Sequence, residues 1–550
     1  MNNYLGISIG PISATLSQAR KTRELWLGSY FFSHVMKLIL EHVQQYGTII
    51  AQDISKLKDD EKLHGAGIYS DRCYVKLDKE FGKEQYDKLV ESVLNTILVE
   101  DKEALKEYLQ IYCTVQDVEK NPILVLNHHL NAMELQTQYY PENIYALSSG
   151  YDERKKLSYN GERVILPTTI NGLIQEWYEE AFDKNDRNDL IKYFINNKII
   201  YSFPSLLEIS TKGLERRFPE LYSEDIHPEF EKELEEEMEN KEIKQTSDTT
   251  ILEKIKETFN KDFQTAHKYL AIVSADADNM GKLLLKIDEK DKNEKLLDDF
   301  SKYAAKFSRK ASQVIYEYGG KPVYIGGDDL LFFAPVVSHS RNSSECWFQN
   351  NTHIFRLIEK LDQEFNEIWT PWFEKHPELK NKTTLSYGIS MTYYKYPLNE
   401  ANDLSGILLK RAKEIQGKNR IAVQVMTHSG SFDEVILDKF GENSSFKQLL
   451  YLLEIFHENP DKKEDVINSV LQRLRTDTTL LLAIGEDKDS FRPYFTNEYD
   501  LETAGETKEF IVHSISLFDE IFSKHDSKEK ALNELCTLYR LLNFLIHKEK

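Results

Sequence analysis

The sequence is poor in cysteine, and the few cysteines are scattered. They are Cys73, Cys113, Cys346 and Cys536, and no two of them lie two or three residues apart. This spacing excludes a zinc ribbon and a redox CxxC pair. Single scattered cysteines are typical of reduced thiols, so we expect a cytoplasmic protein.

Long hydrophobic runs are absent as well. The first residues, MNNYLGISIGP, contain no basic segment followed by an apolar stretch, and nowhere do about 18 uncharged apolar residues follow one another. We therefore expect neither a signal peptide nor a membrane span. Two common nucleotide-binding signatures, Walker A and GxGxxG, are also missing.

Net positive charge is lacking too. The 550 residues carry a formal net charge of −21, with 41% hydrophobic and 29% charged residues. The length predicts three or four domains, and the composition is typical of a globular protein. A protein that binds nucleic acid alone by neutralising phosphates is usually basic. Any nucleic acid would therefore be held by a local patch or by partner subunits.

The hydrophobic pattern predicts an α+β chain in four parts. Residues 1–165 form a first domain, with a strand at 4–9, a long amphipathic helix whose apolar stripe is Leu27, Phe31, Val35 and Leu38, and a loop leading into a strand at 61–78. Further helices are expected around 84–119. Residues 166–250 are predicted to be helical and linker, with a boundary in the acidic run 228–248.

The next part, residues 251–430, has a clear β-α-β-β-α-β order, which is the ferredoxin-like arrangement. Its predicted strands are 268–275, 322–326, 330–334, 383–394 and 420–426, and its helices are 296–318, 351–375 and 399–416. Residues 431–550 have almost purely helical patterning and predict a C-terminal helical bundle.

The first strands of the two α/β parts resemble each other. YLGISIGP and YLAIVSAD align with Tyr4 opposite Tyr269, which sets Pro11 opposite Asp276. This similarity suggests a duplicated domain whose first copy lost its carboxylate.

Chemistry-bearing residues gather around one hairpin, VYIGGDDLLFF. The hairpin supplies Asp328 and Asp329, and the strand SADADNMGK supplies Asp276. Neighbouring strands lie about 4.8 Å apart, so Asp276 and Asp328 can reach one cation together. Oxygen ligands suit Mg²⁺ or Mn²⁺, and a pair of such ions would activate a hydroxyl and stabilise leaving pyrophosphate. Gly326 and Gly327 would let the backbone approach a nucleotide.

Simpler interpretations remain for both charged clusters. Gly and Asp are common turn formers, so GGDD can be hairpin chemistry alone. Adjacent acids nevertheless repel unless a cation offsets them, which favours a metal site. Likewise a helix ends within the segment that carries Lys410, Lys413, Lys418 and Arg420, and cations near a helix C-terminus are ordinary capping residues. Beside the aspartates, Lys413 and Lys418 would neutralise a triphosphate.

The motifs carry a family resemblance. YIGGDDLLFFAP, with YLAIVSADADNMGKLL before it and YGISM and AKEIQGKNRIAV after it, resembles the palm domain of nucleotidyl cyclases and polymerases. The segment SIGPISATLSQARKTRELWLGSYFFSHVM resembles the large palm subunit of type III-B CRISPR effector complexes, the Cmr type. The resemblance implies two facing palm-like domains, of which only the second carries the aspartates.

The resemblance also implies an activity and its residues. Pairing of guide RNA with target RNA would switch on synthesis of a nucleotide second messenger from ATP, within a complex of other Cmr subunits. Asp276 and Asp328 would be metal ligands assisted by Asp329 and the Ala277 carbonyl, and these three aspartates would be catalytic. The ATP contacts implied are Asp278, Asn279, Gly326, Gly327, Lys413 and Lys418; those to the acceptor nucleotide are Ser8, Gly10, Asp71 and Arg72.

Two departures from the family pattern shape the expectations. Many members begin with an HD nuclease domain, whereas this sequence starts at the first palm, so we expect no DNase activity. Many also carry a four-cysteine zinc site, but YALSSGYDERKK stands in that place, so we expect no zinc.

The identity of the acceptor is left open by the residues. A branch that lacks the HD domain joins ATP to S-adenosylmethionine. The positive sulfonium of this acceptor would favour a nearby acid, for which Asp71 is the candidate, although an Asp before an Arg is also an ordinary salt bridge. We favour this product, with cyclic oligoadenylates as the alternative. A catalytically silent scaffold and a free-standing cyclase are the competing classes of function.

Overall fold

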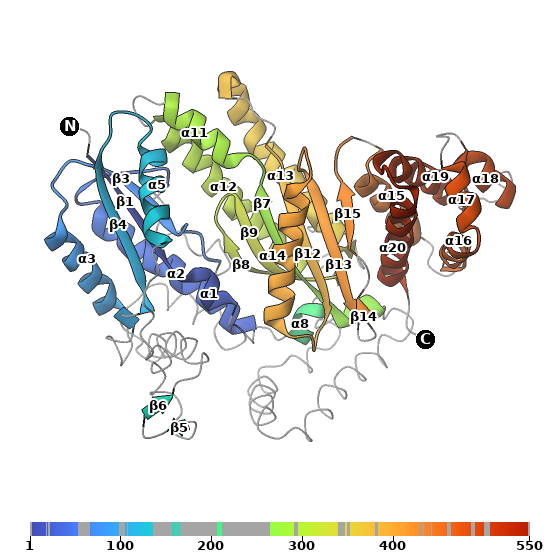
Figure 1. Cartoon of the computed structure of the whole chain (residues 1–550), viewed down its shortest axis with the longest axis horizontal. Coiled ribbons are helices and arrows are strands. Elements are labelled where there is room, and N and C mark those ends of the chain that lie inside the picture. Colours follow the sequence, from blue (N-terminus) through green and yellow to red (C-terminus); the bar gives the residue numbers. More distant parts are fainter. Residues whose placement is uncertain are drawn as a thin grey trace.

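The computed structural model describes most of the chain as two mixed α/β domains and a helical bundle (Figure 1). The described residues are 3–17, 19, 22–52, 66–97, 105–106, 108–135, 157–159, 162–164, 206–211, 264–290, 295–338, 347–348, 352–379, 383–427, 430–431, 434–441, 443–458, 464–485, 490–499 and 507–547.

The first domain is built on a four-stranded antiparallel sheet of order β2-β3-β1-β4. Its long helix α2 forms as the apolar stripe predicts, because Leu27, Phe31 and Val35 are buried against the sheet and Leu38 is half-buried. The elements are β1 (Asn3–Gly10), α1 (Ile12–Leu16), α2 (Thr22–Val43), β2 (Gly47–Ile50), β3 (Arg72–Leu77), α3 (Lys83–Thr96), β4 (Gln110–Asp117) and α5 (Pro122–Glu134).

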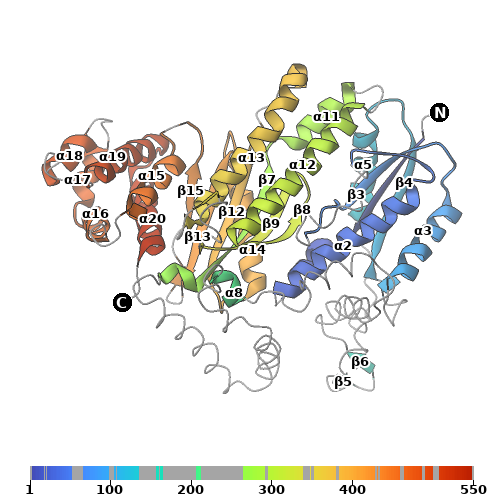
Figure 2. The same ribbon diagram turned by 180° about the vertical axis from the view of Figure 1, so that it is seen from behind.

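The second domain is built on a larger sheet of order β14-β13-β12-β7-β9-β8, with β15 also paired to β13. Helix α14 covers one face of this sheet (Figure 1), and α12 and α13 pack together over the other (Figure 2). The strands are β7 (Tyr269–Ala277), β8 (Lys321–Ile325), β9 (Asp329–Pro335), β12 (Leu385–Tyr393), β13 (Arg420–Thr427), β14 (Gly430–Ser431) and β15 (Val435–Asp438); the helices are α11 (Met280–Lys290), α12 (Lys295–Tyr318), α13 (Ile354–Lys375) and α14 (Leu398–Glu414).

The two sheets share one topology. Numbered within each domain, both place the first four strands in the order 2-3-1-4, which is the ferredoxin-like arrangement. The predicted α+β fold with two ferredoxin-like domains is therefore confirmed. Short additional elements are β5 (Leu157–Tyr159), β6 (Glu162–Val164), α8 (Leu206–Ser210), η7 (Thr265–Lys268), β10 (Val337–Ser338), β11 (Thr352–His353) and η8 (Pro377–Leu379).

A backbone contact joins the two domains. Gly67, between α2 and β3, donates to the Val323 carbonyl at 3.2 Å and accepts from the Ile325 N–H at 2.8 Å. The segment thereby pairs with the edge strand β8, and Ser29 of α2 donates to the same Val323 carbonyl at 3.3 Å. The contact fixes the first domain against the β8 edge of the second sheet.

The C-terminal part is a helical bundle, as its pattern predicts, but it begins later than residue 431. β14 and β15 still belong to the second sheet, because their backbone groups pair with β13. The bundle helices are α15 (Ser445–Glu458), α16 (Glu464–Thr476), α17 (Thr478–Ile484), α18 (Phe491–Glu498), α19 (Thr507–Lys524) and α20 (Lys528–Ile546).

One helical prediction is wrong in part. Residues 84–119 do not form helices throughout, because β4 is an edge strand paired with β1 along its whole length. Its sequence QIYCTVQD is rich in β-branched and aromatic residues, which suit a pleated, half-buried surface. Pairing with β1 decides the conformation here.

Several predictions lie outside the described residues. These concern the acidic run 228–248, almost all of the helical and linker region 166–250, and the segment YALSSGYDERKK at 145–156. Within the described part of the chain, no helix is both long enough and apolar enough to cross a membrane.

Candidate functional site

The acidic residues of the hairpin meet the end of β7. Asp276 on β7 lies directly opposite Asp329 on β9. Asp328 is bonded to the end of β7 through its backbone carbonyl, which accepts from the Ala277 N–H at 2.9 Å. The three predicted acids are therefore brought together, although Asp329 rather than Asp328 is the direct cross-strand partner of Asp276.

The two glycines shape the turn in different ways. Gly327 has φ +90°, which L-residues with side chains rarely adopt, and a Cβ there would lie 3.0 Å from the Ala304 Cβ. A Cβ on Gly326 would lie 2.1 Å from the Tyr324 hydroxyl. Both positions therefore need glycine for the observed hairpin, which bends the chain against α12.

The surroundings of Asp328 and Asp329 disfavour the charged forms of both carboxyl groups. Loss of solvation, followed by the charge of Asp276, raises the pKa of Asp328 to about 6. Loss of solvation and the neighbouring Asp328 raise the pKa of Asp329 as well. Both side chains nevertheless keep an opening to solvent, since Asp328 is half-buried and Asp329 is exposed. A cation that entered would relieve the repulsion.

A lysine already stands beside the acids. The Lys413 ammonium, at the end of α14, forms an ion pair with the Asp276 carboxylate. Lys418 follows in the turn between α14 and β13, with φ +53° and its N–H bonded to the Ile415 carbonyl at 3.0 Å. The two lysines expected near a triphosphate thus lie at the sheet end that carries the aspartates.

The candidate donor set has the oxygen chemistry that a hard divalent cation prefers. It consists of the Asp276, Asp328 and Asp329 carboxylates and the Ala277 carbonyl at the end of β7, all of them oxygen ligands. Among the described residues, no group of three His, Cys, Asp or Glu side chains converges as a ready metal site. The ion pair with Lys413 occupies Asp276, so ion binding would require this lysine to move.

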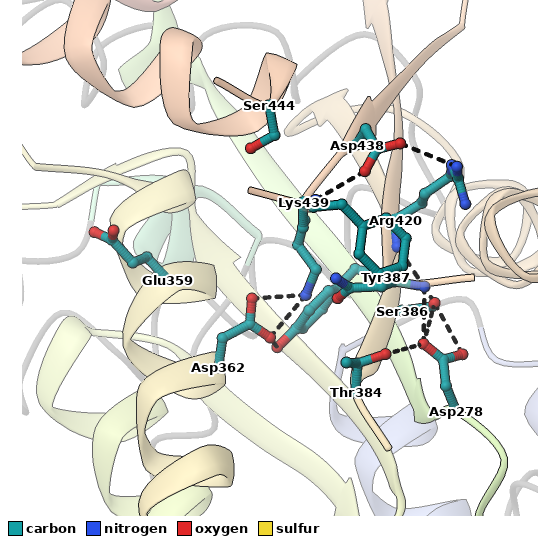
Figure 3. Close-up of polar contacts among 12 residues, drawn as sticks. Asp278, Glu359, Asp362, Thr384, Ser386, Tyr387, Arg420, Asp438, Lys439 and Ser444 are labelled. Atoms are coloured by element: carbon teal, nitrogen blue, oxygen red, sulfur yellow. Dashed lines mark hydrogen bonds and ion pairs between the residues drawn. The ribbon is translucent and has the colours of Figure 1, made fainter. Parts of the chain in front are cut away.

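Asp278 has a different environment from the one expected of an ATP contact. Its side chain is fully buried and accepts hydrogen bonds from Thr384 Oγ1 at 2.7 Å, Ser386 Oγ at 2.9 Å and the Asn419 N–H at 2.9 Å (Figure 3). The following residue, Asn279, has φ +61° and directly precedes α11. Asp278 therefore holds the loops around the site together.

A cavity of about 400 Å³ lies between the two domains, next to the hairpin. From the second domain, Gly326, Gly327 and Asp328 line it. From the first domain, Asp71 and Arg72 line it, so two of the four predicted acceptor residues face this space. Ser8 and Gly10 are not among its lining residues.

The first domain carries a changed copy of the acidic site. The Ile9 N–H donates to the Asp71 carbonyl at 2.9 Å, as Ala277 does to Asp328, and Ser8 lies opposite Arg72 as Asp276 lies opposite Asp329. Ser8, rather than the predicted Pro11, therefore corresponds to Asp276. The first copy lost two carboxylates but retains Asp71.

These first-domain side chains form a network. Arg72 is paired with Glu134 at 2.7 Å and donates to Asn127 at 2.8 Å, while Ser8, fully buried, donates to Glu134 at 2.5 Å. Burial raises the pKa of Asp71, Glu134 raises it further, and Arg72 opposes this shift. The cavity thus has one acid on each side, Asp71 and Asp328.

Part of the cavity wall was not predicted from the sequence. Ser301, Ala304, Ala305 and Ser308 of α12 line it, together with Arg309 and, from the first domain, Gln52 and Asn127. The small residues of α12 recur three, four and seven residues apart, which places them on one face of the helix. This pattern could have indicated from the sequence that the helix face leaves open space. These small residues leave room beside the GGDD turn.

The second domain combines a ferredoxin-like sheet with acids at the end of its first strand and at the hairpin, which is the arrangement that the resemblance to palm domains implies. Residues 269–422 match the family model of the Cas10/Cmr2 second palm domain. Residues 4–52 match that of CRISPR-associated protein Cmr2, N-terminal. The two segments that carry the resemblance are therefore those that match this family.

Whole-protein comparisons are more distant. The CRISPR system Cmr subunit Cmr2 of Pyrococcus furiosus is 24% identical over 208 residues, which cover 33% of this chain and 22% of that protein. A chain of the type III-B Cmr-beta complex bound to cognate target RNA has 12% identity and a TM-score of 0.47, covering 94% of this chain and 78% of the other. Csm1 of T. onnurineus has 13% identity and a TM-score of 0.47, covering 100% and 70%.

Proposed function

We propose that the chain is the nucleotidyltransferase subunit of a type III CRISPR complex and makes a nucleotide second messenger from ATP. A ribose 3′-hydroxyl would attack the ATP α-phosphate, and pyrophosphate would leave. The observation that carries this proposal is the direct pairing of Asp276 with Asp329 beside a cavity between two palm-like domains. The match of residues 269–422 to the Cas10/Cmr2 second palm domain supports it.

The acidic residues would hold Mg²⁺ or Mn²⁺. Asp276, Asp328, Asp329 and the Ala277 carbonyl supply oxygen ligands, and two divalent ions, when bound, activate the attacking hydroxyl and stabilise the leaving oxygen. The raised pKa of Asp328 supports this role, because a carboxyl crowded by like charges gains most from a cation.

The basic residues would hold the triphosphate. Lys413 would leave Asp276 and turn to the phosphates, and Lys418 would join it from the turn before β13. Gly326 and Gly327 line the cavity and carry no side chain that would keep a nucleotide away from the Asp328 backbone. The chain's own residues would thus bind and orient ATP. Asn279, directly before α11, would be a further ATP contact.

The first domain would receive the acceptor. Asp71 and Arg72 face the cavity, with Ser8 and Gly10 behind them at the end of β1. We propose S-adenosylmethionine as acceptor, giving a conjugate with AMP, because a sulfonium cation would favour the ionised form of Asp71, whose pKa burial raises. With ATP as acceptor the products would be cyclic oligoadenylates.

The partners would be other Cmr-type subunits, with guide RNA and target RNA held mainly by them in the cytoplasm. The net charge of −21 supports this division of labour.

The test is to incubate the assembled complex with target RNA, labelled ATP and Mg²⁺ or Mn²⁺, with and without S-adenosylmethionine, and to identify products by mass spectrometry. The proposal expects an S-adenosylmethionine–AMP conjugate only when that acceptor is present. Identical products in both mixtures would reject this acceptor. Absence of pyrophosphate release in every mixture would reject the activity and favour a silent scaffold.

A further inference from the structure

The turn that carries Lys418 has an unusual backbone. Gly417, Lys418 and Asn419 have φ values of +94°, +53° and +53°. Left-handed conformations cost free energy at residues with a side chain, and they persist where the surroundings fix them. The groups that fix this turn therefore decide where Lys418 lies.

The catalytic strand fixes one side of the turn. The buried Asp278 carboxylate, directly after β7, accepts from the Asn419 N–H at 2.9 Å. Asp278 in turn donates through its own N–H to the Thr384 carbonyl at 2.6 Å. This side of the turn is thus tied to the strand that bears Asp276.

Arg420 fixes the other side. Its guanidinium is buried and donates through Nη1 to the Gln416 carbonyl at 3.1 Å and the Lys418 carbonyl at 2.6 Å. Through Nη2 it donates to Asp438 Oδ2 at 3.0 Å (Figure 3). A charged carboxylate that accepts from Arg420 orients the guanidinium toward the two carbonyls of the turn.

Asp438 is also the point where the bundle joins the palm. Its N–H donates to Ser445 Oγ, the first residue of α15, at 2.9 Å. Nearby, Lys524 of α19 donates to the Ile436 carbonyl of β15 at 2.9 Å. The bundle is therefore bonded to β15 from two of its helices, and β15 ends at Asp438.

The residue after Asp438 is anchored in the palm. Lys439 is buried with only 4% of its side chain exposed, and it forms an ion pair with Asp362 of α13 at 2.6 Å (Figure 3). Tyr387 of β12 donates to the same carboxylate at 2.9 Å, and the Lys439 ammonium lies 4.7 Å from its ring centre. This anchor keeps Asp438 beside Arg420.

We infer that Asp438 is a positioning residue for the ATP-phosphate turn, and that it links the attachment of the C-terminal bundle to the position of Lys418. The inference rests on the proposed function, in which Lys418 contacts the triphosphate. Asp438 itself touches no substrate; it acts through Arg420 and the carbonyls of the turn.

The test is ATP affinity of the full chain, measured by titration with ATP and Mg²⁺. Asp438→Asn keeps one oxygen to accept from the Phe440 N–H, now at 2.8 Å, but removes the charge facing Arg420. We expect its Kd for ATP to rise about five- to tenfold. In a Lys418→Ala background the same substitution should add less than about twofold, because coupled residues are not additive.

A matched control breaks a neighbouring ion pair. Glu434 precedes β15 and pairs with Arg411 of α14, so Glu434→Gln also removes one carboxylate partner of an arginine. It should leave the ATP Kd unchanged. An equal rise of the ATP Kd in Glu434→Gln would indicate a general loss of structure and overturn the positioning role. Additive effects of Asp438→Asn and Lys418→Ala on this Kd would overturn it too.

The link to the bundle has its own test. Ser445→Ala removes the side chain that accepts from the Asp438 N–H, and we expect a rise in ATP Kd in the same direction, absent in the Lys418→Ala background. An unchanged Kd would overturn the link. If the wild-type chain binds ATP but the assembled complex does not turn it over, only the proposed function is contradicted. If the wild-type chain fails to bind ATP, the proposed function and the positioning role of Asp438 are both contradicted.

Discussion

Asp276 and Asp329 lie directly opposite each other on β7 and β9, and burial, together with the charges of Asp328 and Asp276, raises the pKa of Asp329. Two acids in directly opposite positions repel each other unless one is protonated or a cation lies near them. The Lys413 ammonium is such a cation, and its ion pair with Asp276 compensates part of the negative charge. The proposed activity depends on this relationship.

Replacement of Asp329 by Asn should stabilise the metal-free chain while abolishing activity. The pKa of Asp329 is raised, so its charged form is disfavoured in the folded state near neutral pH. We expect a higher Tm in EDTA at pH 7.5, by a few degrees, and loss of ATP turnover by about 100-fold or more. Thermal melts and pyrophosphate release measure the two effects; a lower Tm would mean that Asp329 supports the fold.

The stability of the metal-free chain should fall as pH rises from about 4 to about 6. Near the ordinary value of 3.8 the Asp328 carboxyl starts to release its proton in the unfolded chain, whereas the folded chain keeps it until about pH 6. The unfolded state is thus favoured increasingly across this window, and the loss is complete above it.

The matching measurement is the difference in unfolding free energy between wild type and Asp328→Asn across that pH range in EDTA. The difference should grow in favour of the variant as pH rises. Mg²⁺ affinity of the wild type should rise over the same range, because ion and proton compete. A difference that is flat with pH would contradict the raised pKa.

Lys413→Ala should separate ion binding from ATP binding. Removal of the ammonium frees Asp276, so Mg²⁺ affinity should stay equal or increase. Turnover of ATP should fall about 10- to 100-fold, because a charged phosphate contact is lost. Lys410→Ala, on the same helix, is the control and should leave both quantities within about twofold. Weaker Mg²⁺ binding in Lys413→Ala would contradict the proposal that Lys413 leaves Asp276 when the ion binds.

Gly388→Ala should damage the site from a distance. A Cβ on this residue of β12 would lie 2.2 Å from the Ser405 carbonyl and the Leu409 N–H, so α14 would have to move away from the sheet. We expect a loss of about 3 kcal/mol or more in unfolding free energy. Gly406→Ala, on α14 itself, meets nothing within 4 Å and should stabilise the chain by about 0.5–1 kcal/mol. Denaturant unfolding measures both, and equal effects would contradict the close contact.

Sequence patterns predicted the second domain closely because its strands and helices are strongly periodic, and Asp276, Asp328 and Asp329 follow from strand order alone. The register was harder: whether Asp328 or Asp329 faces Asp276 depends on the turn at Gly327. The repeat between the domains was misaligned by three residues, since Tyr4 and Tyr269 match by chemistry while the hydrogen-bonded ladders equate Ser8 with Asp276.

Residues that act through tertiary contacts left little trace in the sequence. Asp278 belongs to the same acidic motif as Asp276, yet it is buried and bonded to Asn419, more than a hundred residues away in sequence. Strand β4 was predicted to be helical because its pairing with β1 cannot be read from local pattern. The cavity wall from α12 arises only when the two domains are packed together.

The most direct measurement is pyrophosphate release from ATP by the assembled complex with target RNA and Mg²⁺, comparing the wild type with Asp328→Ala/Asp329→Ala. The account predicts turnover by the wild type, loss by about 100-fold or more in the variant, and intact assembly of both complexes. Equal turnover in both complexes would contradict the claim that these aspartates carry the reaction. Failure of the variant to assemble would show that their role is structural.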